Sequence, residues 1–403
     1  MFFQSGFRRF FLAFTLAFII LFWVVLLACQ HGGKNNSSST ADIDYDTSAD
    51  DTQIDDDDEY YQFPDDIVLY GTLSLEEVNY NLSEIQKFSW RSWEEEIRFE
   101  NCQLLSIWGI NENNIYAVGR QEIANWDLSH DFVTSWTIKP YIAHYNYGNW
   151  ETEITDEYFY SYTGINGKSE TNIYLVGGQY LGGFGGYVIK HYNGVKWNTE
   201  ATGGEGKYLN DVWVTPSGIV AAVGAIDIPM GSLFVVKENG VWNEKEKIGD
   251  NFFLYTVWGD ENNDIYAGGE EIYKYENGEW KAIESPVHNN QNYVIKIAGT
   301  DSNNIYAVAV NSGDNEVFII HYNGVEWNVI ELFEGAIYGP EWGTHLYIPN
   351  LANNSIGLWV SENNDVFFSF PLYHHRTYVY HEEKWYLLSY DIGANAIWGI
   401  KNQ

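Results

Sequence analysis

Cysteine and basic residues are scarce in this chain of 403 residues. It has two cysteines, Cys29 and Cys102, and 21 Lys and Arg against 56 Asp and Glu, so its formal net charge is −35. Two cysteines in segments of different character exclude a disulfide framework, and we expect Cys102 to be a small buried apolar residue. A phosphate backbone needs a basic face, so this charge excludes nucleic acid as a partner.

The short motifs of common hydrolases are missing as well. The chain has no Gly-x-Ser-x-Gly, no phosphate-binding loop and no His-Glu-x-x-His. Only 2 methionines and a shortage of Ala, Leu and Lys runs argue against a helical bundle. In contrast, 17 Trp and 31 Tyr favour strands, because aromatic side chains suit a pleated, half-buried surface. We predict an all-β protein that holds no cofactor and no metal.

The amino terminus has the layout of an export signal. Basic Arg8 and Arg9 precede an apolar run over residues 10–28, and Cys29 follows. The end of this run, Leu26-Leu27-Ala28-Cys29, resembles the bacterial lipobox, in which the cysteine receives a diacylglycerol. This resemblance implies a signal peptide over residues 1–29 and a membrane anchor on Cys29. The alternative is an uncleaved transmembrane anchor, because 19 apolar residues nearly span a bilayer.

The residues after Cys29 predict the cellular location of the protein, and they also predict an unfolded tether. Gln30 and His31 stand where an Asp favours retention in the inner membrane in similar lipoproteins, so we expect the outer membrane or the cell surface. Residues 30–64 are polar and acidic, and such a segment buries too little apolar surface to fold. The folded body is therefore predicted over residues 65–403.

One pattern recurs along this body. An apolar run such as Leu104–Gly109 is followed by a polar turn and by a second run such as Asn114–Gly119, then by a strand that ends in Tyr145, and by Trp150. Asn-Gly pairs before the later tryptophans are tight-turn signals, so each unit holds two hairpins. Four antiparallel strands make one blade of a β-propeller.

The count of units is seven. The tryptophans of the fourth strands are Trp93, Trp150, Trp197, Trp242, Trp280, Trp327 and Trp385. The unit at Trp93 lacks a first strand, and Ala396–Ile400 is a first strand with nothing after it. We predict a seven-bladed β-propeller closed by a blade that the two ends of the chain share, which leaves no exposed sheet edges in the ring.

These repeats resemble bacterial lipoprotein propellers of the bacterial-neuraminidase-repeat and kelch-like kind. The Asp-box of sialidases has Asp two residues before Gly, whereas Tyr192 and Tyr322 stand there in this chain, so the repeats are not true Asp-boxes. A sialidase binds the carboxylate of its substrate with three arginines. In this chain, Arg98, Arg120 and Arg376 fall in neighbouring blades. A sialidase-like, glycan-acting hydrolase is thus an alternative function, although no paired carboxylates can be assigned.

Long loops are expected on one face of the propeller and short turns on the other. The expected long loops are 120–140, 179–186, 225–232, 333–355 and 371–377. A face with long, variable loops commonly carries binding residues, and exposed rings can stack on ligands. The candidate ligand-binding residues on these loops are Trp126, Trp136, Tyr180, Phe184, Trp342, His345, Tyr373, His374 and His375. The histidines suggest zinc, but His374 and His375 point in different directions on an extended chain.

The leading interpretation is a non-catalytic binding or scaffold protein. It is expected to be monomeric, to be held at the membrane by the lipid on Cys29, and to recognise a protein or a polysaccharide through its long-loop face. A structural component of an envelope assembly is a further alternative, because propellers host all of these functions.

Overall fold

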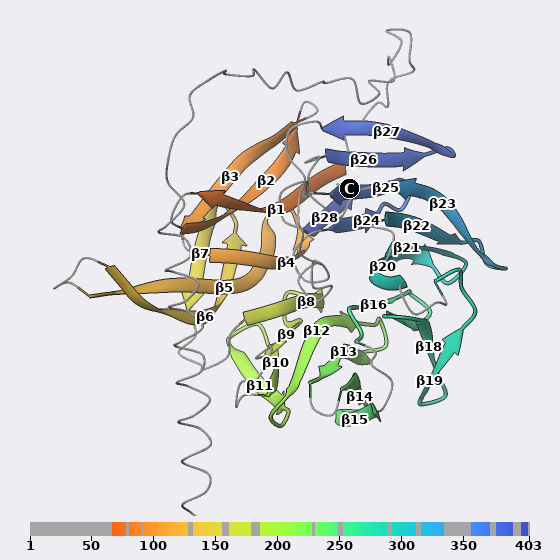
Figure 1. Cartoon of the computed structure of the whole chain (residues 1–403), viewed down its shortest axis with the longest axis horizontal. Helices are drawn as coiled ribbons and strands as arrows, with labels where there is room; N and C mark the ends of the chain where they lie inside the picture. The colour runs from red at the N-terminus through yellow and green to blue at the C-terminus, as the bar shows by residue number, and fades with distance from the viewer. Residues whose placement is uncertain are drawn as a thin grey trace, which may run out of the picture. The chain divides into compact units, whose positions relative to one another are not determined.

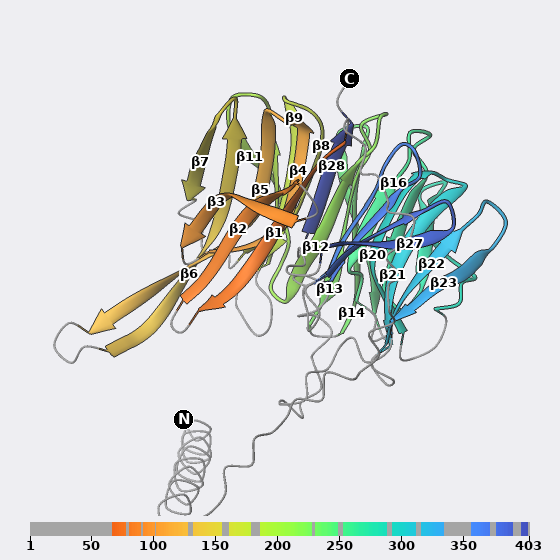
Figure 2. The same cartoon turned by 90° about the horizontal axis from the view of Figure 1, so that it is seen from above.

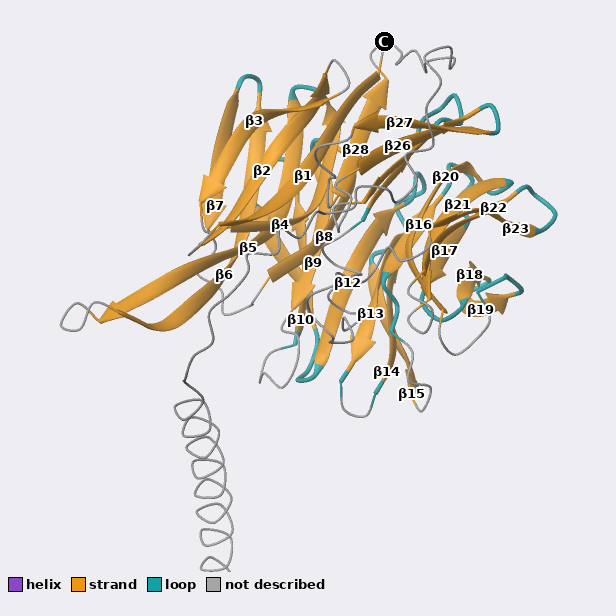
Figure 3. Cartoon of the chain, turned by 45° about the horizontal axis from the view of Figure 1, so that its top comes forward, coloured by secondary structure: helices purple, strands orange, loops and turns teal. Residues whose placement is uncertain are grey.

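The computed structural model divides the chain into two compact units, Met1–Glu59 and Tyr60–Gln403. The residues that the structure describes all belong to the second unit, and they are strands and turns without a helix (Figure 3). They are residues 67–77, 80–89, 92–100, 102–127, 132–154, 161–178, 186–227, 230–248, 253–287, 292–311, 316–333, 356–370, 376–389 and 396–401. The predicted signal peptide, tether and lipidated Cys29 lie outside them, so the domain boundaries there stay a prediction.

The described strands form four-stranded antiparallel sheets that are arranged as the blades of a β-propeller (Figure 1). The all-β propeller that we expected is therefore observed. Six sheets consist of four strands that follow one another in the chain, and we number them blades 1 to 6. A further sheet, called the composite sheet, has the order β28-β1-β2-β3.

The strand bounds follow the predicted repeats. Blade 1 consists of β4(Cys102–Asn111), β5(Asn114–Asp127), β6(Phe132–Asn146) and β7(Asn149–Ile154), and blade 2 of β8(Ser161–Ser169), β9(Asn172–Gly178), β10(Tyr187–Tyr192) and β11(Trp197–Thr202). Blade 3 consists of β12(Lys207–Val214), β13(Val220–Ile226), β14(Gly231–Glu238) and β15(Val241–Ile248), and blade 4 of β16(Thr256–Gly259), β17(Ile265–Gly268), β18(Ile272–Glu276) and β19(Glu279–Ile283). Blade 5 consists of β20(Asn292–Asp301), β21(Asn304–Asn311), β22(Glu316–Tyr322) and β23(Trp327–Phe333), and blade 6 of β24(Gly357–Val360), β25(Val366–Phe370), β26(Arg376–His381) and β27(Lys384–Ser389).

The composite sheet joins the two ends of the described chain. It consists of β1(Ile67–Glu77), β2(Tyr80–Ser89), β3(Ser92–Glu100) and β28(Ala396–Lys401). β28 pairs with β1 in antiparallel register from Ile67↔Lys401 to Thr72↔Ala396. The expected pairing of the carboxy-terminal strand with the amino-terminal partial unit is present.

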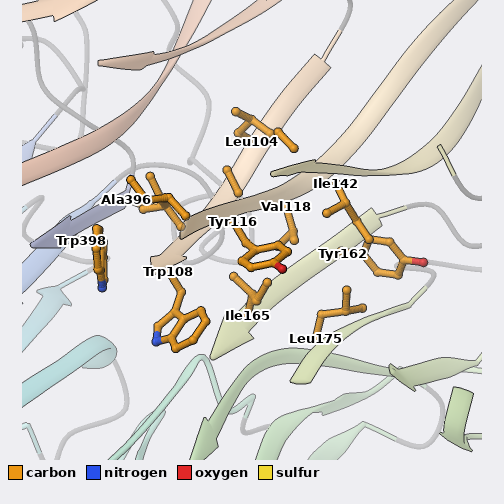
Figure 4. Packing of buried hydrophobic residues seen from close by; sticks show 14 of the residues in the cluster. Leu104, Trp108, Tyr116, Val118, Ile142, Tyr162, Ile165, Leu175, Ala396 and Trp398 are labelled. Atoms are coloured by element: carbon orange, nitrogen blue, oxygen red, sulfur yellow. The ribbon is translucent and has the colours of Figure 1, made fainter. Parts of the chain in front are cut away.

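The first strands of the sheets contact one another in sequence. β4 contacts β8, and the contacts continue through β12, β16, β20, β24 and β28 back to β4. Figure 4 shows the core where the composite sheet meets blades 1 and 2: Trp398, Trp108, Tyr116 and Ile165 lie in one buried apolar cluster. This core combines residues from both ends of the described chain.

Each fourth-strand tryptophan of blades 1, 2, 4, 5 and 6 packs on a tyrosine at or next to the end of the third strand. Tyr145 lies opposite Trp150 in the strand register, and their ring centroids are 5.3 Å apart. The equivalent pairs are Tyr192 and Trp197, Tyr275 and Trp280, Tyr322 and Trp327, and Tyr380 and Trp385. Cross-strand aromatic pairs stabilise a hairpin, which explains why Tyr and Trp recur at this spacing.

The Asn-Gly hairpins adopt two different turns. Asn239 and Gly240 both have positive φ, as a tight two-residue hairpin turn requires. In the turn at Asn193, only Gly194 has positive φ, and the side-chain Oδ1 of Asn193 accepts hydrogen bonds from the backbone N–H groups of Val195 and Lys196. Both forms are short, as we expected. The connections from first to second strand on the same face are longer in blades 3, 4 and 6, where residues 215–219, 260–264 and 361–365 lie between the strands.

Candidate functional site

The longest described strands form an arm on blade 1. β5 and β6 contain 14 and 15 residues, and they remain paired out to Asp127↔Phe132. Their neighbours stop earlier: β4 pairs with β5 only as far as Gln121, and β7 pairs with β6 only from Tyr141. We call residues 122–127 and 132–140 the arm; Figure 2 shows it projecting beyond the other blades.

The arm corrects one expectation from the sequence. Residues 120–140 are not a long loop, because all of them except 128–131 belong to the paired strands β5 and β6. The expected loop 225–232 is shorter too, since β13 continues to Ile226 and β14 begins at Gly231. Both differences have one cause: strand pairing satisfies backbone N–H and C=O groups that a loop would leave to water.

Two of the candidate ligand-binding residues lie on the arm. Trp126 is opposite Val133 and Trp136 is opposite Ala124, with a β-bulge between Asn125 and Trp126. The structure describes the backbone of these tryptophans. Seven candidates lie outside the described residues, and their role as ligand contacts stays a prediction: Tyr180, Phe184, Trp342, His345, Tyr373, His374 and His375.

The base of the arm contains the cysteine of the folded body. Cys102 lies at the start of β4 with 1% of its surface exposed, and it forms no disulfide among the described residues. Burial raises the pKa of its thiol to about 12, and a hydrogen bond with Tyr141 opposes part of that rise. The thiol is therefore inert at neutral pH, and the expectation of a small buried apolar residue is confirmed.

The opposite face carries a network of backbone and side-chain links between turns. The turn after each first strand is tied to the corresponding turn of the next blade from blade 3 to blade 6. The links are Ser217 N–H to Asn263 Oδ1 at 2.8 Å, Ser302 N–H to Asp260 Oδ2 at 3.0 Å, and Asn304 Nδ2 to Asn364 Oδ1 at 2.9 Å. These asparagines and aspartates join blades, which is a structural role.

An ionic network that the sequence did not indicate joins blades 2 and 3. Glu200 accepts hydrogen bonds from Lys237 Nζ at 2.5 Å and from the indole N–H of Trp242 at 3.2 Å, and it lies 3.0 Å from His191 Nδ1. Lys237 also donates to the Tyr174 hydroxyl at 3.0 Å. These residues come from five strands of two blades, so no spacing in the sequence could have brought them together.

Burial decides the protonation of His191 in this network. Loss of hydration lowers the pKa of His191, Glu200 opposes that shift, and the charge of Lys237 adds to it. The ring of His191 stacks on Tyr174 at 4.4 Å between centroids. The network therefore holds a neutral imidazole beside an ion pair at neutral pH, and it stabilises the contact between the blades.

Buried carboxylates of the first strands and turns are also saturated with donors. Asp211 accepts hydrogen bonds from the N–H groups of Val212 and Val257 and from the Thr256 hydroxyl, at 2.9 to 3.1 Å. Desolvation raises the pKa of Asp211 above its ordinary value, while Lys296 opposes the rise. Asp260 accepts N–H bonds from its own turn and from the next blade. These acids hold neighbouring blades together, which leaves no spare carboxylate pair for glycoside hydrolysis among them.

Among the residues that the structure describes, no group of three or more His, Cys, Asp or Glu side chains has the arrangement of a metal site. The same residues include no helix of the length and apolarity that a bilayer span requires. Arg98, Arg120 and Arg376 lie in β3, β5 and β26, on three different sheets, as the sequence indicated.

Comparison with known proteins supports the fold. No protein-family model matches the chain, and no curated protein matches it. Several solved structures are similar to this chain. One is a functionally unknown protein from Desulfotomaculum acetoxidans. It is 11% identical over 84% of this chain and 100% of that chain, and its TM-score is 0.52. Another is a protein from Lactobacillus plantarum, at 10% identity over 83% and 99%, with a TM-score of 0.52.

A third similar structure is a candidate 6-phosphogluconolactonase from Bacteroides fragilis. It is 11% identical over 83% of this chain and 98% of that chain, and its TM-score is 0.51. At such identities, the likeness concerns the fold alone. The fold is therefore shared with these proteins, whereas the likeness carries no information about the binding site of this chain.

Proposed function

We propose that this protein is a non-catalytic binding module, and that the arm of blade 1 is part of its recognition surface. The observation that carries the proposal is the length of β5 and β6, which stay paired beyond the end of both neighbouring strands. A two-stranded ribbon alone is only marginally stable in water, so the arm adds little to the stability of the fold. Its presence therefore favours a role in binding. An extended ribbon offers contact area to a partner, whereas catalysis needs groups that converge on one point.

The ligand is proposed to be a protein or a polysaccharide. Trp126 and Trp136 in the arm are the residues we expect to contribute ring stacking, because large aromatic rings dominate interface energies. A binding role is preferred to the hydrolase alternative, since the carboxylates of Asp211 and Asp260 are engaged in contacts between blades.

Removal of the arm tests this function. Residues 124–136 are replaced by Asn-Gly, which joins the paired residues Ile123 and Thr137 by a tight turn and keeps the register of β5 and β6. The variant should melt within a few degrees of the native protein, because residues 114–121 keep their sheet partners. It should lose capture of envelope components in a pull-down and lose signal on a glycan array, whereas the matched surface variant Lys196→Ala should keep both. Equal capture by both variants rejects the arm as a binding element.

The membrane attachment is part of the same proposal. The signal over residues 1–29 would be cleaved before Cys29, and the lipid on Cys29 would hold the propeller outside the cytoplasm, at the outer membrane or the cell surface. Radiolabelled palmitate should enter the native protein and not Cys29→Ala. Labelling of both, or a mature protein that still begins at Met1, contradicts the anchor.

We also infer that the composite sheet is a seventh blade that closes the ring. Two observations support this closure: β28 pairs with β1, and β28 contacts both β24 of blade 6 and β4 of blade 1. A closed ring would leave no first strand without a neighbouring blade, which keeps the recognition surface rigid.

A further inference from the structure

The outer strand of blade 5, β23, combines few charged residues with exposed apolar side chains. β23 is the last strand in the order of its sheet, so one of its edges has no strand partner among the residues that the structure describes. Such an edge presents backbone N–H and C=O groups that can pair with another chain. Native proteins commonly protect these edges with charged side chains.

Charged residues protect other outer strands of this protein. β15 has the sequence VWNEKEKI, β3 has SWEEEIRFE and β7 has NWETEI. β23 has the sequence WNVIELF, with Glu331 as its single charged residue. The outer strands β11 (WNTEAT) and β27 (KWYLLS) also have one charged residue each, so charge protects these three strands less than the others.

Apolar side chains are exposed on the same hairpin. Val329 and Leu332 are 52% and 43% exposed, and Val325 in the turn before the strand is 84% exposed. In the register, Val329 lies opposite Ile320 and Leu332 lies opposite Phe318. Val329 and Leu332 therefore continue the face that blade 5 turns to blade 4.

Blade 4 covers part of this face. Phe318, Ile320 and Trp327 pack in one cluster with Ile272 and Ile283 of blade 4. Val329 and Leu332 are not members of this cluster, and they remain 52% and 43% exposed. The apolar face of β23 therefore continues beyond the part that blade 4 covers.

We propose that β23 binds an extended polypeptide segment of another protein by strand addition, with Val329 and Leu332 as its apolar contacts. The segment would alternate apolar and basic residues, because Glu326 and Glu331 lie on either side of Val329 along the chain. A second copy of this chain is the poorer occupant, since two molecules of net charge −35 repel each other. Main-chain hydrogen bonds supply affinity in this mode, and alternate side chains supply specificity.

This surface is separate from the proposed recognition arm, which belongs to blade 1. The two proposals can therefore fail independently. Strand addition needs free amides on the added peptide, complementary charge and the exposed apolar face, and each of these requirements can be removed by itself.

The test uses a fluorescent ten-residue peptide of alternating Val and Lys, titrated with the full chain while anisotropy is measured. Saturable binding is expected, and Val329→Lys and Leu332→Lys should each weaken it at least about tenfold. Val195→Lys is the matched control, because Val195 is 83% exposed in blade 2 and the change adds the same charge. This control should bind the peptide within about twofold of the native protein.

Two control peptides separate strand addition from charge attraction. A peptide with N-methyl groups on alternate amides and a peptide of alternating Val and Glu should both fail to bind. The proposal is overturned if either control peptide binds like the Val-Lys peptide, or if Val195→Lys weakens binding as much as Val329→Lys. A concentration-dependent dimer in sedimentation that Val329→Lys abolishes would also overturn it, because a second copy would then be the occupant.

Discussion

The indole of Trp398 covers Gly109. A Cβ atom on residue 109 would lie 2.6 Å from the ring of Trp398, which is closer than two carbon atoms can approach. Trp398 belongs to β28 and Gly109 to β4, so this contact joins the composite sheet to blade 1. The same relationship recurs between Trp108 and Gly167, where a Cβ would lie 2.7 Å from the indole.

Gly109→Ala should destabilise the protein by about 1 to 3 kcal/mol, the usual cost of overpacking a core. The added methyl group must displace a large buried ring, because the indole fills the space. Urea unfolding of the native and variant proteins measures the difference. Gly204→Ala is the control, since a Cβ there meets nothing within 4 Å. Equal stabilities of the two variants would show that Trp398 can move away without cost.

Deletion of residues 393–403 should have a larger effect. It removes β28, and with it the strand partner of β1 and the ring of Trp398 from the core shared with blade 1. Two unpaired edges and exposed apolar surface should lead to aggregation or to a loss of several kcal/mol. Thermal unfolding and light scattering check this outcome. A truncated protein that melts like the intact one excludes a structural role for the shared sheet.

The repeated elements could be predicted from the sequence because local chemistry determines them. Tyr145 and Trp150 flank a tight turn, and their pairing on neighbouring strands follows from that turn alone. The pairing of β28 with β1 could also be predicted, because the first unit lacked a strand that the last segment supplied. Burial of Cys102 followed from its place at the start of an apolar strand.

Contacts between blades could not be predicted in the same way. Nothing in the sequence relates Lys237 to Glu200, because the contact depends on how two separate sheets pack. The arm was missed since polar residues such as Asn125 and Asp127 in its tip indicated a loop, while strand pairing there depends on its partner strand. Exposure of Val329 likewise depends on how blade 4 packs against blade 5, which the sequence of β23 does not contain.

His321 should make stability depend on pH. Burial lowers the pKa of this histidine below its ordinary 6.5, its ring stacks on Tyr306, and its Nε2 lies 2.7 Å from Asn304 Oδ1. The unfolded chain therefore binds a proton more readily than the folded one. The neutral ring of His321 therefore contributes fully to the free energy of unfolding above about pH 6.5. As the pH falls below that value, this contribution is lost, by at most about 1.4 kcal/mol per pH unit.

The difference in unfolding free energy between the native protein and His321→Gln isolates this effect from the many carboxylates. The advantage of the native protein should shrink from pH 7.5 to pH 5.5. An advantage that grows on acidification would mean that the folded protein favours the charged imidazole, contrary to its burial.

Lys237 should control both the stability of the contact between blades 2 and 3 and the protonation of His191. Lys237→Met keeps a side chain of similar length but leaves Glu200 without its cation, and the side chains of Lys237 and Glu200 are only 17% and 22% exposed. Loss of one partner from such a pair should cost about 1 to 3 kcal/mol. Lys245→Met should cost much less, because Lys245 and its partner Glu279 are 45% and 69% exposed.

The second readout distinguishes an electrostatic role for Lys237 from packing. Its charge lowers the pKa of His191, while Glu200 raises that pKa, so removal of the charge should let His191 hold its proton to higher pH. A titration of the His191 ring resonances by NMR should show the pKa rising in Lys237→Met and staying in place in Lys245→Met. Both ring nitrogens of His191 face acceptors, Glu200 on one side and Asn172 Oδ1 at 3.0 Å on the other, so the charged ring has a hydrogen-bond partner for each proton. A destabilised variant with an unmoved His191 pKa would mean that Lys237 stabilises the contact through Glu200 and through the rings of Trp242 and Tyr174, without acting on His191.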